Sequence, residues 1–445
     1  MTSKRYPGNI ISSTATNPTG DAANGVWNLS DVEEFKAGNK WPTLPLAPTI
    51  GTATNPETGG VIIVPFTPGE LYGGTAQYTV TSNPGSLTNT GSSSPISVGG
   101  LTNETSYTFS VVAVTGAGTS AASSASNSIA PTQADRGVFM AGQTLSSPYA
   151  TNTMDYINIK STGNATDFGD LAEKRGGGGA ASSSTRGLNM AGGDIFGDPG
   201  STNYSNRIDY ITIANTGNSV YFGALANSKR TQMVGLSNDT RALQTFGQKS
   251  NGQREQQIEY VTIASTGNAS SFGDAGYQAT DTSVGFASTT RGVFGGGTDE
   301  YGANRNDIRY VTIASTGNST DFGDWSIGNF RSGGTSSNTR GLGMLYSGSS
   351  NGIYLVTIAS TGNSGGFGNL LNPGGNTSSG RSYYMTATSN NTRAVIAEGY
   401  NNSSGGINTL SYVTISTTGD AADFGDLTVA RYMTGAVSGT HGGIS

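Results

Sequence analysis

The sequence contains no cysteine and a single histidine, His441, among its 445 residues. The absence of thiols excludes disulfide bonds, cysteine nucleophiles and zinc sites that use cysteine ligands. A Ser-His-Asp triad would have to use His441, because the triad needs an imidazole as its base. A lone histidine beside two glycines is more typical of a structural residue than of a metal ligand. We therefore expect neither an enzyme nor a bound metal or cofactor.

Charge is also scarce, since only 12% of the residues are charged and the net charge is −6. No block of Lys or Arg stands out, so a surface that follows nucleic-acid phosphates is not expected. No apolar run is long enough to cross a bilayer, and the first residues lack the apolar core of a secretory signal. We expect no nucleic-acid partner, no membrane insertion and assembly in a cytoplasm.

Glycine, serine, threonine and asparagine are abundant instead, with 68 glycines in the chain. Glycine and asparagine suit turn positions, whereas threonine and valine favour strands. Hydrophobic residues make up 34% of the sequence, which is enough for packed cores in two or three domains. The composition predicts an all-β protein.

One sequence motif recurs along the second two-thirds of the chain. The string "YVTIASTGNSTDFGD" at Tyr310–Asp324 returns in similar form from Tyr156, Tyr260 and Tyr412. Three anchors recur in order, namely a "TRG" arginine, an "STGN" turn and an "FGD" segment. Successive turn glycines are 54, 50, 50, 45 and 57 residues apart, and they are Gly163, Gly217, Gly267, Gly317, Gly362 and Gly419. The distance from turn to "FGD" is constant, so the variation must lie in other loops, such as 192–207.

A period near 50 with four short apolar segments per unit is typical of a kelch-like β-propeller. A strand at about 431–438 should pair with strands in 135–170 and complete a unit that neither end of the chain contains alone. This arrangement predicts six blades in residues 133–445. The five complete units are expected to begin at Arg175, Arg230, about Tyr277, Arg331 and Arg381.

The recurring residues are expected to be structural. The "TRG" arginine and the "FGD" aspartate occur once per unit, which favours contacts between blades. In "IRYVTI", Ile308 and Tyr310 should face one neighbouring blade and Val311 and Ile313 the other, because side chains alternate along a strand. The turn glycine should supply a positive φ. A copper oxidase of the kelch type is excluded because it needs cysteine, and the loop 298–307 resembles a calcium-binding loop only loosely.

Residues 45–132 contain short strands separated by turns. The stretch 107–114 alternates, with Tyr107, Phe109, Val111 and Ala113 on one face. Together, "PLAPTIGTAT" and "GLTNETSYTFSVVAVTGAGTSAASSAS" resemble a fibronectin type III domain. The resemblance implies a β-sandwich with a tyrosine corner, in which the Tyr107 hydroxyl bonds to nearby backbone. Such domains are spacers or binding modules, and we expect a spacer.

Residues 1–44 form a separate segment. Ser30 and Glu33 make a capping box that predicts a short helix over 31–37, ended by Gly38. The segment has many large apolar side chains but is too short to enclose them. They would pack on the neighbouring domain or dock into a partner protein, and we favour docking. The residues expected to bind the partner are Tyr6, Ile10, Ile11, Trp27, Leu29, Phe35 and Trp41.

The texts "RYPGNII" and "GVWNLSDVEEFKAGNKWP", taken with the repeats, are similar to virion structural proteins of marine and cyanobacterial tailed phages. The resemblance implies that residues 1–44 bind other virion proteins, that 45–132 form the spacer and that 133–445 are displayed. Several copies per virion are expected, and homo-oligomers are an open alternative. The first hypothesis is a tail fibre or receptor-binding appendage that recognises a host-surface glycan or protein without catalysis. The alternative is an architectural part of the capsid, baseplate or neck.

A glycan-cleaving enzyme would need paired carboxylates in one cleft, and the sequence offers no such pair outside the repeats. Tyrosines in irregular loops are candidate receptor contacts, because their rings can stack on sugars. These candidates are Tyr204, Tyr301, Tyr383, Tyr384 and Tyr400. Partial burial against neighbouring loops is the alternative for each of them.

Overall fold

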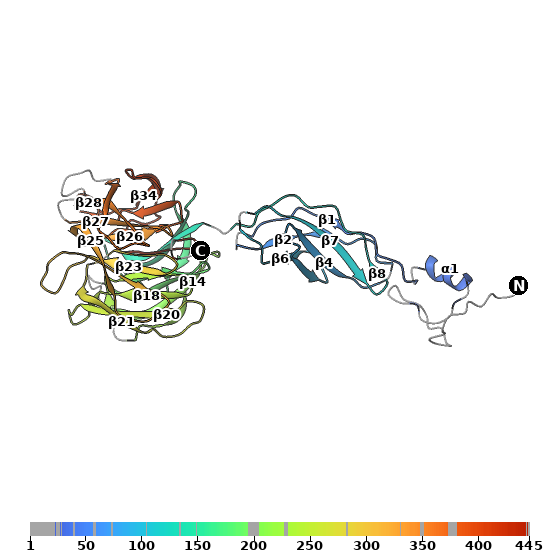
Figure 1. Cartoon of the computed structure of the whole chain (residues 1–445), viewed down its shortest axis with the longest axis horizontal. Coiled ribbons are helices and arrows are strands. Elements are labelled where there is room, and N and C mark those ends of the chain that lie inside the picture. Colours follow the sequence, from blue (N-terminus) through green and yellow to red (C-terminus); the bar gives the residue numbers. More distant parts are fainter. Residues whose placement is uncertain are drawn as a thin grey trace. The chain divides into compact units, whose positions relative to one another are not determined.

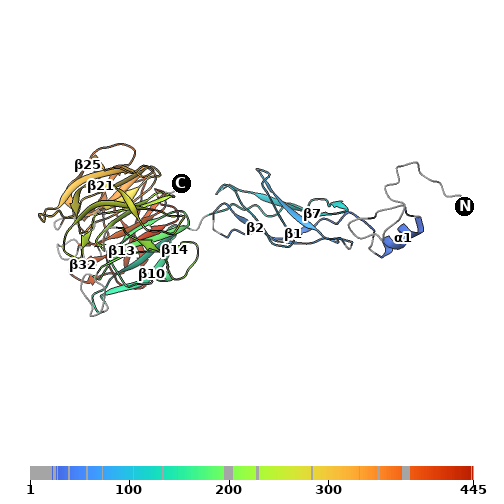
Figure 2. The same cartoon turned by 90° about the horizontal axis from the view of Figure 1, so that it is seen from below.

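The structure is a computed structural model that describes residues 23, 27, 29–38, 41–56, 59–72, 74–103, 105–132, 135–147, 149–194, 204–226, 230–281, 284–329, 331–347, 351–372, 381–441 and 443. The protein is all-β, as predicted, with a single helix among these residues. The chain divides into two compact units, Met1–Ala134 and Asp135–Ser445, and each is described by itself. Figures 1 and 2 show the elements of both units.

The helix of unit 1 is α1 (Leu29–Ala37), and none of its side chains is buried. It ends where the sequence predicted, since the Gly38 N–H bonds to the Glu34 carbonyl at 3.0 Å. Its predicted start was wrong. The helix begins at Leu29, so Ser30 lies in the first turn instead of preceding it as the N-terminal cap.

Most of the other described residues of unit 1 form short antiparallel sheets around one apolar core. The alternation predicted for residues 107–114 is confirmed, because Phe109, Val111 and Ala113 are all buried. The Tyr107 hydroxyl accepts a hydrogen bond from the Thr102 N–H at 3.0 Å, as expected for a tyrosine corner. The sheets are β1 (Thr49–Ile50) with β3 (Phe66–Thr67); β2 (Ile62–Val64) with β6 (Ile96–Val98); and β5 (Thr88–Gly91), β4 (Gln77–Asn83), β7 (Thr108–Thr115) and β8 (Gly118–Thr119).

The described residues of unit 2 form six four-stranded antiparallel sheets, called sheets 1 to 6 below. Sheet 1 is β36 (Gly435–Ser438), β9 (Arg136–Gln143), β10 (Ala150–Asn158) and β11 (Thr166–Asp170). Sheet 2 is β12 (Gly179–Ser182), β13 (Arg186–Gly192), β14 (Ser205–Thr212) and β15 (Val220–Ala224). Sheet 3 is β17 (Val234–Ser237), β18 (Arg241–Thr245), β20 (Glu255–Thr262) and β21 (Ser270–Ala279).

Sheet 4 is β22 (Val284–Ala287), β23 (Arg291–Gly295), β24 (Arg305–Thr312) and β25 (Thr320–Asn329). Sheet 5 is β26 (Gly333–Ser336), β27 (Arg340–Tyr346), β28 (Asn351–Thr357) and β29 (Gly365–Asn369). Sheet 6 is β30 (Thr386–Ser389), β31 (Arg393–Ala397), β34 (Thr409–Thr414) and β35 (Ala422–Asp426). Two small pairs, β16 (Arg230–Thr231) with β19 (Gln248–Lys249) and β32 (Tyr400–Asn401) with β33 (Gly405–Gly406), lie outside them.

The first strands of the six sheets meet around a common axis. Each contacts the first strand of the next sheet, from β12 through β17, β22, β26 and β30 to β36, and β36 contacts β12 again. Sheet 1 joins the two ends of unit 2, because β36 pairs antiparallel with β9 and places Val437 opposite Val138. The pairing between the last strand and the first repeat therefore occurs as predicted.

Each sheet is covered on both faces by its neighbours. Ile308 and Tyr310 of β24 pack with Phe322 in a core shared by sheets 4 and 5. Val311 and Ile313 pack in the core shared by sheets 3 and 4. The predicted division of this strand's side chains is confirmed. Apolar contact between sheets is therefore the main source of stability in unit 2.

The two edges of the ring differ in loop length. At one edge, the connection between the third and fourth strands is seven residues long in every sheet, as in 159–165 and 213–219. The connection between the first and second strands at this edge is three residues long in sheets 2 to 6, as in 183–185. At the other edge, the connection between the second and third strands ranges from four residues (347–350) to twelve (193–204). We call these the short-turn edge and the long-loop edge. The predicted location of the length variation is confirmed.

Candidate binding site on the long-loop edge

The "TRG" arginines join neighbouring sheets at the short-turn edge. The guanidinium of Arg291 lies 4.6 Å from the ring centre of Tyr310 on its own sheet. It also donates to the carbonyls of Ile358 and Ala359 on sheet 5, at 3.0 and 2.9 Å. Equivalent hydrogen bonds are made by Arg136, Arg186, Arg241, Arg340 and Arg393. Since Arg393 of sheet 6 reaches sheet 1, these contacts complete the circle, and the predicted structural role is confirmed.

The "STGN" turn of each sheet is hydrogen-bonded to the "FGD" segment of the preceding one. The Gly267 N–H donates to the Phe222 carbonyl at 2.9 Å, and Asn268 Oδ1 accepts from the Ala224 N–H at 3.1 Å. A Cβ on Gly223 would lie under 3.0 Å from the Gly267 carbonyl. The same holds for the middle glycine of the other copies, Gly169, Gly273, Gly323, Gly368 and Gly425. The glycine of "FGD" is thus required by close approach of two backbones.

Two details of this contact differ from expectation. The "FGD" aspartate takes part through its backbone: the Asp170 N–H donates to Asn218 Oδ1 at 3.0 Å, while its side chain is exposed. The turn glycines have φ of 153° to 159° only in Gly163, Gly217, Gly317 and Gly362. A left-handed turn residue therefore does not explain the glycine in every copy.

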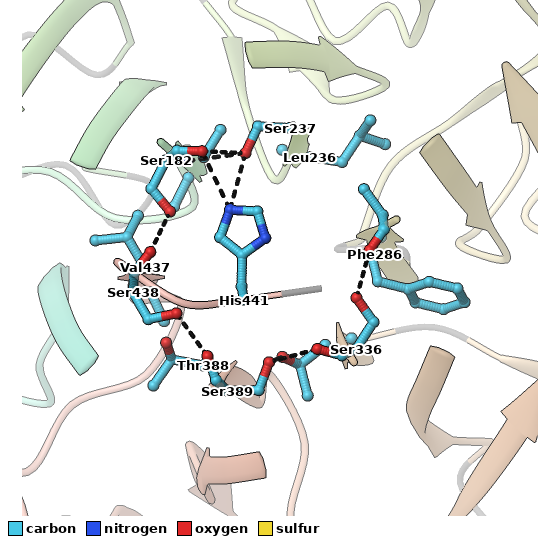
Figure 3. Close-up of a pocket in the computed structure, with 18 of the residues that line it drawn as sticks. Ser182, Leu236, Ser237, Phe286, Ser336, Thr388, Ser389, Val437, Ser438 and His441 are labelled. Carbon is cyan, nitrogen blue, oxygen red and sulfur yellow. Dashed lines mark hydrogen bonds between the residues drawn. The ribbon is translucent and has the colours of Figure 1, made fainter. Parts of the chain in front are cut away.

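Around the axis, a serine ends five of the six first strands and ties each to its neighbour (Figure 3). Ser438 Oγ donates to the Ser389 carbonyl at 2.6 Å, and Ser389 Oγ donates to the Ser336 carbonyl at 2.7 Å. Ser182, Ser237 and Ser336 make equivalent bonds. The remaining cavity holds about 70 Å³, which is room for a few waters only.

His441 lies at the short-turn end of this axis. Its Nδ1 accepts from the Gly443 N–H at 2.9 Å, which leaves Nε2 as the protonated nitrogen, 3.1 Å from the Ser182 carbonyl. Burial lowers the pKa of His441 to about 4. The imidazole is therefore neutral near pH 7 and forms part of the packing between sheets 2 and 3.

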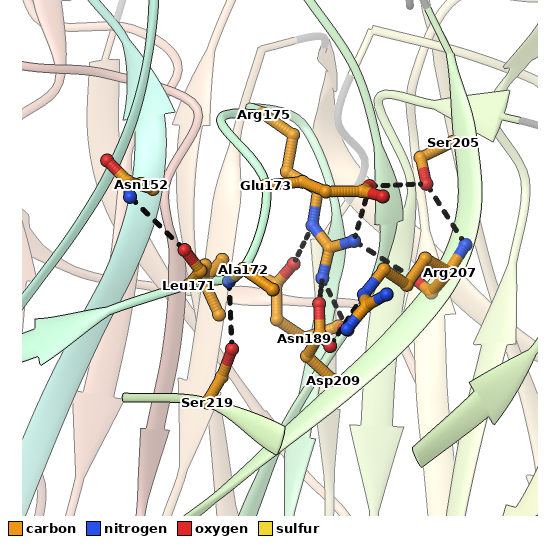
Figure 4. Close-up of polar contacts among 10 residues, drawn as sticks. All are labelled: Asn152, Leu171, Ala172, Glu173, Arg175, Asn189, Ser205, Arg207, Asp209 and Ser219. Carbon is orange, nitrogen blue, oxygen red and sulfur yellow. Dashed lines mark hydrogen bonds and ion pairs between the residues drawn. The ribbon is translucent and has the colours of Figure 1, made fainter. Parts of the chain in front are cut away.

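Buried ion pairs are made by arginines that lie four residues before three of the first strands. Figure 4 shows the pair of sheet 2. Arg175 Nη2 is 2.7 Å from Asp209 Oδ2, and its Nε donates to Asn189 Oδ1 at 3.0 Å. Burial lowers the pKa of Arg175, and the charge of Asp209 opposes this effect. Sheets 1 and 3 contain the equivalent pairs Arg431–Asp155 and Arg230–Glu259.

The other three sheets lack this arginine. Four residues before their first strands stand Thr280, Asn329 and Ser382. The sequence-based assignment of Arg331 and Arg381 to this position was wrong. Arg331 lies two residues after the equivalent position of sheet 5, Asn329, and Arg381 lies one residue before that of sheet 6, Ser382. Arg331 is thereby placed at the long-loop edge, near a group of tyrosines.

Four tyrosines form a closed cluster at that edge. Tyr383 lies 5.5 Å from Tyr384 and 5.0 Å from Tyr400, measured between ring centres. Tyr432 lies 5.8 Å from Tyr384 and 5.1 Å from Tyr400. The Arg331 guanidinium lies over Tyr383 and Tyr384, 5.3 and 5.0 Å from their ring centres. Burial raises the pKa of Tyr383 to about 12, so its hydroxyl stays protonated.

This cluster borders a cavity of about 400 Å³, within the range of small-ligand sites, about 300–1,000 Å³. We call it the tyrosine cavity. Its lining comes from three sheets and their connections, and none of the described residues that line it is acidic. They are Thr144, Leu145, Tyr149, Arg331, Tyr383, Tyr384, Tyr400 and Tyr432.

The predicted receptor contacts are only partly brought together. Tyr383, Tyr384 and Tyr400 share the tyrosine cavity, although Tyr383 is itself buried and not exposed as its loop position suggested. Tyr204 lies on the β13–β14 connection, with its hydroxyl 3.5 Å from Gln248 Oε1. Tyr301 lies on the β23–β24 connection and is 86% exposed. These two are separate from the cavity.

Sequence reasoning missed Tyr432, Tyr149 and Arg331. A signal for Tyr432 was present: it directly follows Arg431, where the aligned units have Gly176 after Arg175 and Thr231 after Arg230. The equivalent residue of sheet 6 is Tyr383, so tyrosine stands in sheets 6 and 1 at a position that is small in sheets 2 and 3. Tyr149 and Arg331 had no such signal, because their positions depend on loop conformation.

In unit 1, three of the predicted anchor residues form an aromatic cluster. Trp27 packs edge-on against Phe35 at 5.2 Å and against Trp41 at 5.7 Å between ring centres. Leu29 is 74% exposed. Tyr6, Ile10 and Ile11 lie outside the described residues.

No known protein family matches the sequence, and no curated protein sequence is significantly similar to it. Within the part of the chain that the structure describes, no three His, Asp or Glu side chains are arranged to hold a metal ion. The only helix described there is too short and too polar to cross a membrane.

Proposed function

We propose that the protein is a non-enzymatic structural protein of a tailed-phage virion, a tail fibre or receptor-binding appendage. In this proposal residues 1–44 bind other virion proteins and 45–132 form a fibronectin type III-like spacer. Residues 133–445 form a six-bladed kelch-like β-propeller that recognises the host surface. The observation that carries the proposal is the difference between the two edges of unit 2.

Asp135, where the chain enters unit 2, lies at the short-turn edge. There it pairs with Lys160 at 2.9 Å and accepts a hydrogen bond from Thr440 at 2.9 Å, which ties the two ends of the unit together. The long loops and the tyrosine cavity lie at the opposite edge. A site displayed away from the point of attachment, on loops of variable length held by a rigid frame, is typical of recognition surfaces.

The anchor role of the first segment is supported by its exposed apolar surface. The helix α1 has no buried side chain. Leu29 is 74% exposed and is not covered by the aromatic cluster of Trp27, Phe35 and Trp41. Large apolar side chains that a chain does not cover itself are typical of a protein interface.

The alternative, an architectural role in the virion, is favoured by one observation. Val220 and Tyr221 on the outermost strand of sheet 2 are each 52% exposed. The equivalent pairs on other outer strands are polar or small, for example Thr166 with Asp167 and Ser270 with Ser271. An apolar pair on one sheet only would suit contact with one neighbouring subunit.

The test is binding of the fluorescently labelled full-length protein to candidate host cells, together with inhibition of adsorption of the phage that encodes it. Saturable binding and blocked adsorption are expected. A Val220→Ser/Tyr221→Ser variant serves as the matched control, because it should bind cells normally. Absence of binding to a demonstrably susceptible host would reject the attachment role. If the same double variant then fails to enter virions, the architectural role is supported.

A further inference from the structure

We infer that the tyrosine cavity binds a saccharide chain, with one sugar ring on the tyrosines and the next in an adjoining cavity. The inference deepens the proposed attachment function and rests on it for the biological ligand. It depends on the chemistry of the lining, on the rigidity of the tyrosines and on the second cavity.

The lining combines aromatic faces with hydrogen-bonding groups. Sugar rings have the same two properties, since their C–H faces pack on aromatic rings while their hydroxyls need partners. Arg331 disfavours a cationic ligand. An entirely apolar ligand would remove water from the polar atoms of this lining without offering them a hydrogen bond in return. Because no described lining residue is acidic, the cavity also lacks the carboxylates that glycosidic cleavage needs.

The tyrosines are held in place before any ligand arrives. The Tyr383 N–H donates to the Tyr400 carbonyl at 2.8 Å, and the Tyr400 N–H donates to the Tyr383 carbonyl at 2.9 Å. The Tyr384 N–H donates to the Arg331 carbonyl at 2.7 Å, and both residues have φ of 56°. The equivalent residues of the other sheets, Gly177, Gln232, Asp281 and Met433, have φ of 55° to 66°, so the repeat itself fixes the backbone of these two residues. A preformed aromatic platform reduces the entropy lost on binding.

A second cavity of about 440 Å³ adjoins the first. Thr144 and Leu145 line both. The second is lined mainly by small and polar residues, such as Thr151 and Asn152, with Lys174 as its one charged side chain. Two adjacent cavities of this size, one aromatic and one polar, fit consecutive residues of a chain better than one isolated ring.

The first experiment uses the full-length protein with defined probes: the methyl glycosides of glucose, mannose, galactose and rhamnose, the disaccharides maltose, lactose and mannobiose, and O-polysaccharide from a susceptible host. Saturation-transfer NMR detects binding, and calorimetry measures affinity. Binding of at least one saccharide, with the two-residue form binding at least tenfold tighter than the matching monosaccharide, is expected. Failure of folded protein to bind any of them overturns the inference. If the monosaccharide and the matching disaccharide bind with equal affinity, the assignment of a second sugar ring to the adjoining cavity is overturned.

Variants then locate the site. Tyr400→Ala should weaken binding at least tenfold, whereas Tyr400→Phe, which keeps the ring, should weaken it less than threefold. Tyr301→Ala is the matched control, since this tyrosine lies on another long loop outside the cavity, and it should leave the affinity unchanged. Lys174→Ala should weaken only the two-residue ligand. Circular dichroism and thermal unfolding identify variants that fail to fold. Equal effects of Tyr301→Ala and Tyr400→Ala would overturn the assignment.

Cell binding separates this inference from the proposed function. If Tyr400→Ala binds host cells as well as the original protein does, the attachment role stands and the assigned cavity is wrong. If the original protein binds a saccharide through Tyr400 but no host cell, the cavity is right and the attachment role is wrong.

Discussion

Two glycines that meet across one sheet boundary should respond to the same substitution in opposite ways. Gly223 of sheet 2 faces the Gly267 carbonyl of sheet 3, and a Cβ added to Gly223 would lie under 3.0 Å from that carbonyl. A Cβ added to Gly267 meets no atom within 4 Å. Neither residue is among the glycines with positive φ. Gly223→Ala should therefore separate the two backbones, and Gly267→Ala should not.

The size of the effect follows from what the separation removes. Forcing a methyl group into a close-packed contact costs about 1–3 kcal/mol. The hydrogen bonds from the Gly267 and Ala269 N–H groups to the Phe222 and Ala224 carbonyls, both 2.9 Å, contribute about 0.5–1.5 kcal/mol each. Gly223→Ala should thus lower the free energy of unfolding of unit 2 by about 2–6 kcal/mol. Gly267→Ala should leave it unchanged or raise it by about 0.4–1 kcal/mol, because alanine restricts the unfolded chain.

The three tryptophans of the chain make the measurement specific. With Trp27→Phe and Trp41→Phe as background, the buried Trp325 of sheet 4 is the single tryptophan and reports on unit 2 in urea unfolding. Gly368→Ala and Gly419→Ala repeat the comparison at the boundary of sheets 5 and 6, where only Gly368 faces a carbonyl. Equal unfolding midpoints within each pair would refute the close backbone contact as the reason for the "FGD" glycine.

Three further substitutions test the buried polar groups. Glu398 is fully buried, and burial raises the pKa of its carboxyl. The stabilising effect of the neutral carboxyl is therefore lost as the pH rises above the pKa of the unfolded chain, near 4.5. Glu398→Gln should unfold at a higher urea concentration than the original protein at pH 8 and at the same concentration at pH 4, and a difference that does not depend on pH would contradict this. Arg431→Met should destabilise unit 2 by about 3–5 kcal/mol because it leaves the buried Asp155 carboxylate without its cation. Arg431→Met/Asp155→Leu should recover most of the loss, and equal instability of both variants in urea unfolding would reject the ion pair as the cause. Arg291→Lys loses the stacked geometry over Tyr310, whereas Arg340→Lys loses no such contact, because sheet 5 has Leu355 at the equivalent position. Arg291→Lys should therefore be more destabilising than Arg340→Lys by about 0.5–1 kcal/mol. The opposite order in urea unfolding would count against the cation–π contribution.

The repeat allowed much of the frame to be predicted. Ile308 and Val311 could be assigned to opposite faces because strand alternation is a local property of the chain. The pairing of residues 435–438 with β9 followed from counting incomplete units at the two ends. The Tyr107 hydrogen bond was expected from the resemblance to a fibronectin type III domain, and its partner, Thr102, is only five residues away. In each case the relevant contact is either short in sequence or repeated six times.

The binding cavity could not be predicted in the same way. Its lining comes from sheets 5, 6 and 1 and from Arg331, which lies between β25 and β26. The sequence-based alignment placed this arginine with Arg175 at the start of a unit and predicted no binding role for it. Tyr383 was predicted to be exposed because it lies in an irregular loop, yet Tyr346 packs against it, 5.0 Å away between ring centres. Contacts made once, between distant segments, leave no periodic signal.

The division between the two edges gives a rule for finding function in such a chain. Contacts such as Arg291 with Ile358 must be made between every pair of adjacent sheets with the same geometry, so the residues at the short-turn edge are constrained to repeat. The connections between the second and third strands at the long-loop edge vary from four to twelve residues and are less constrained. Some positions there keep the backbone contacts of the repeat while the side chain varies, as at Tyr432 and Tyr383, where Gly176 and Thr231 stand in other sheets. They are therefore the positions at which binding chemistry is to be sought.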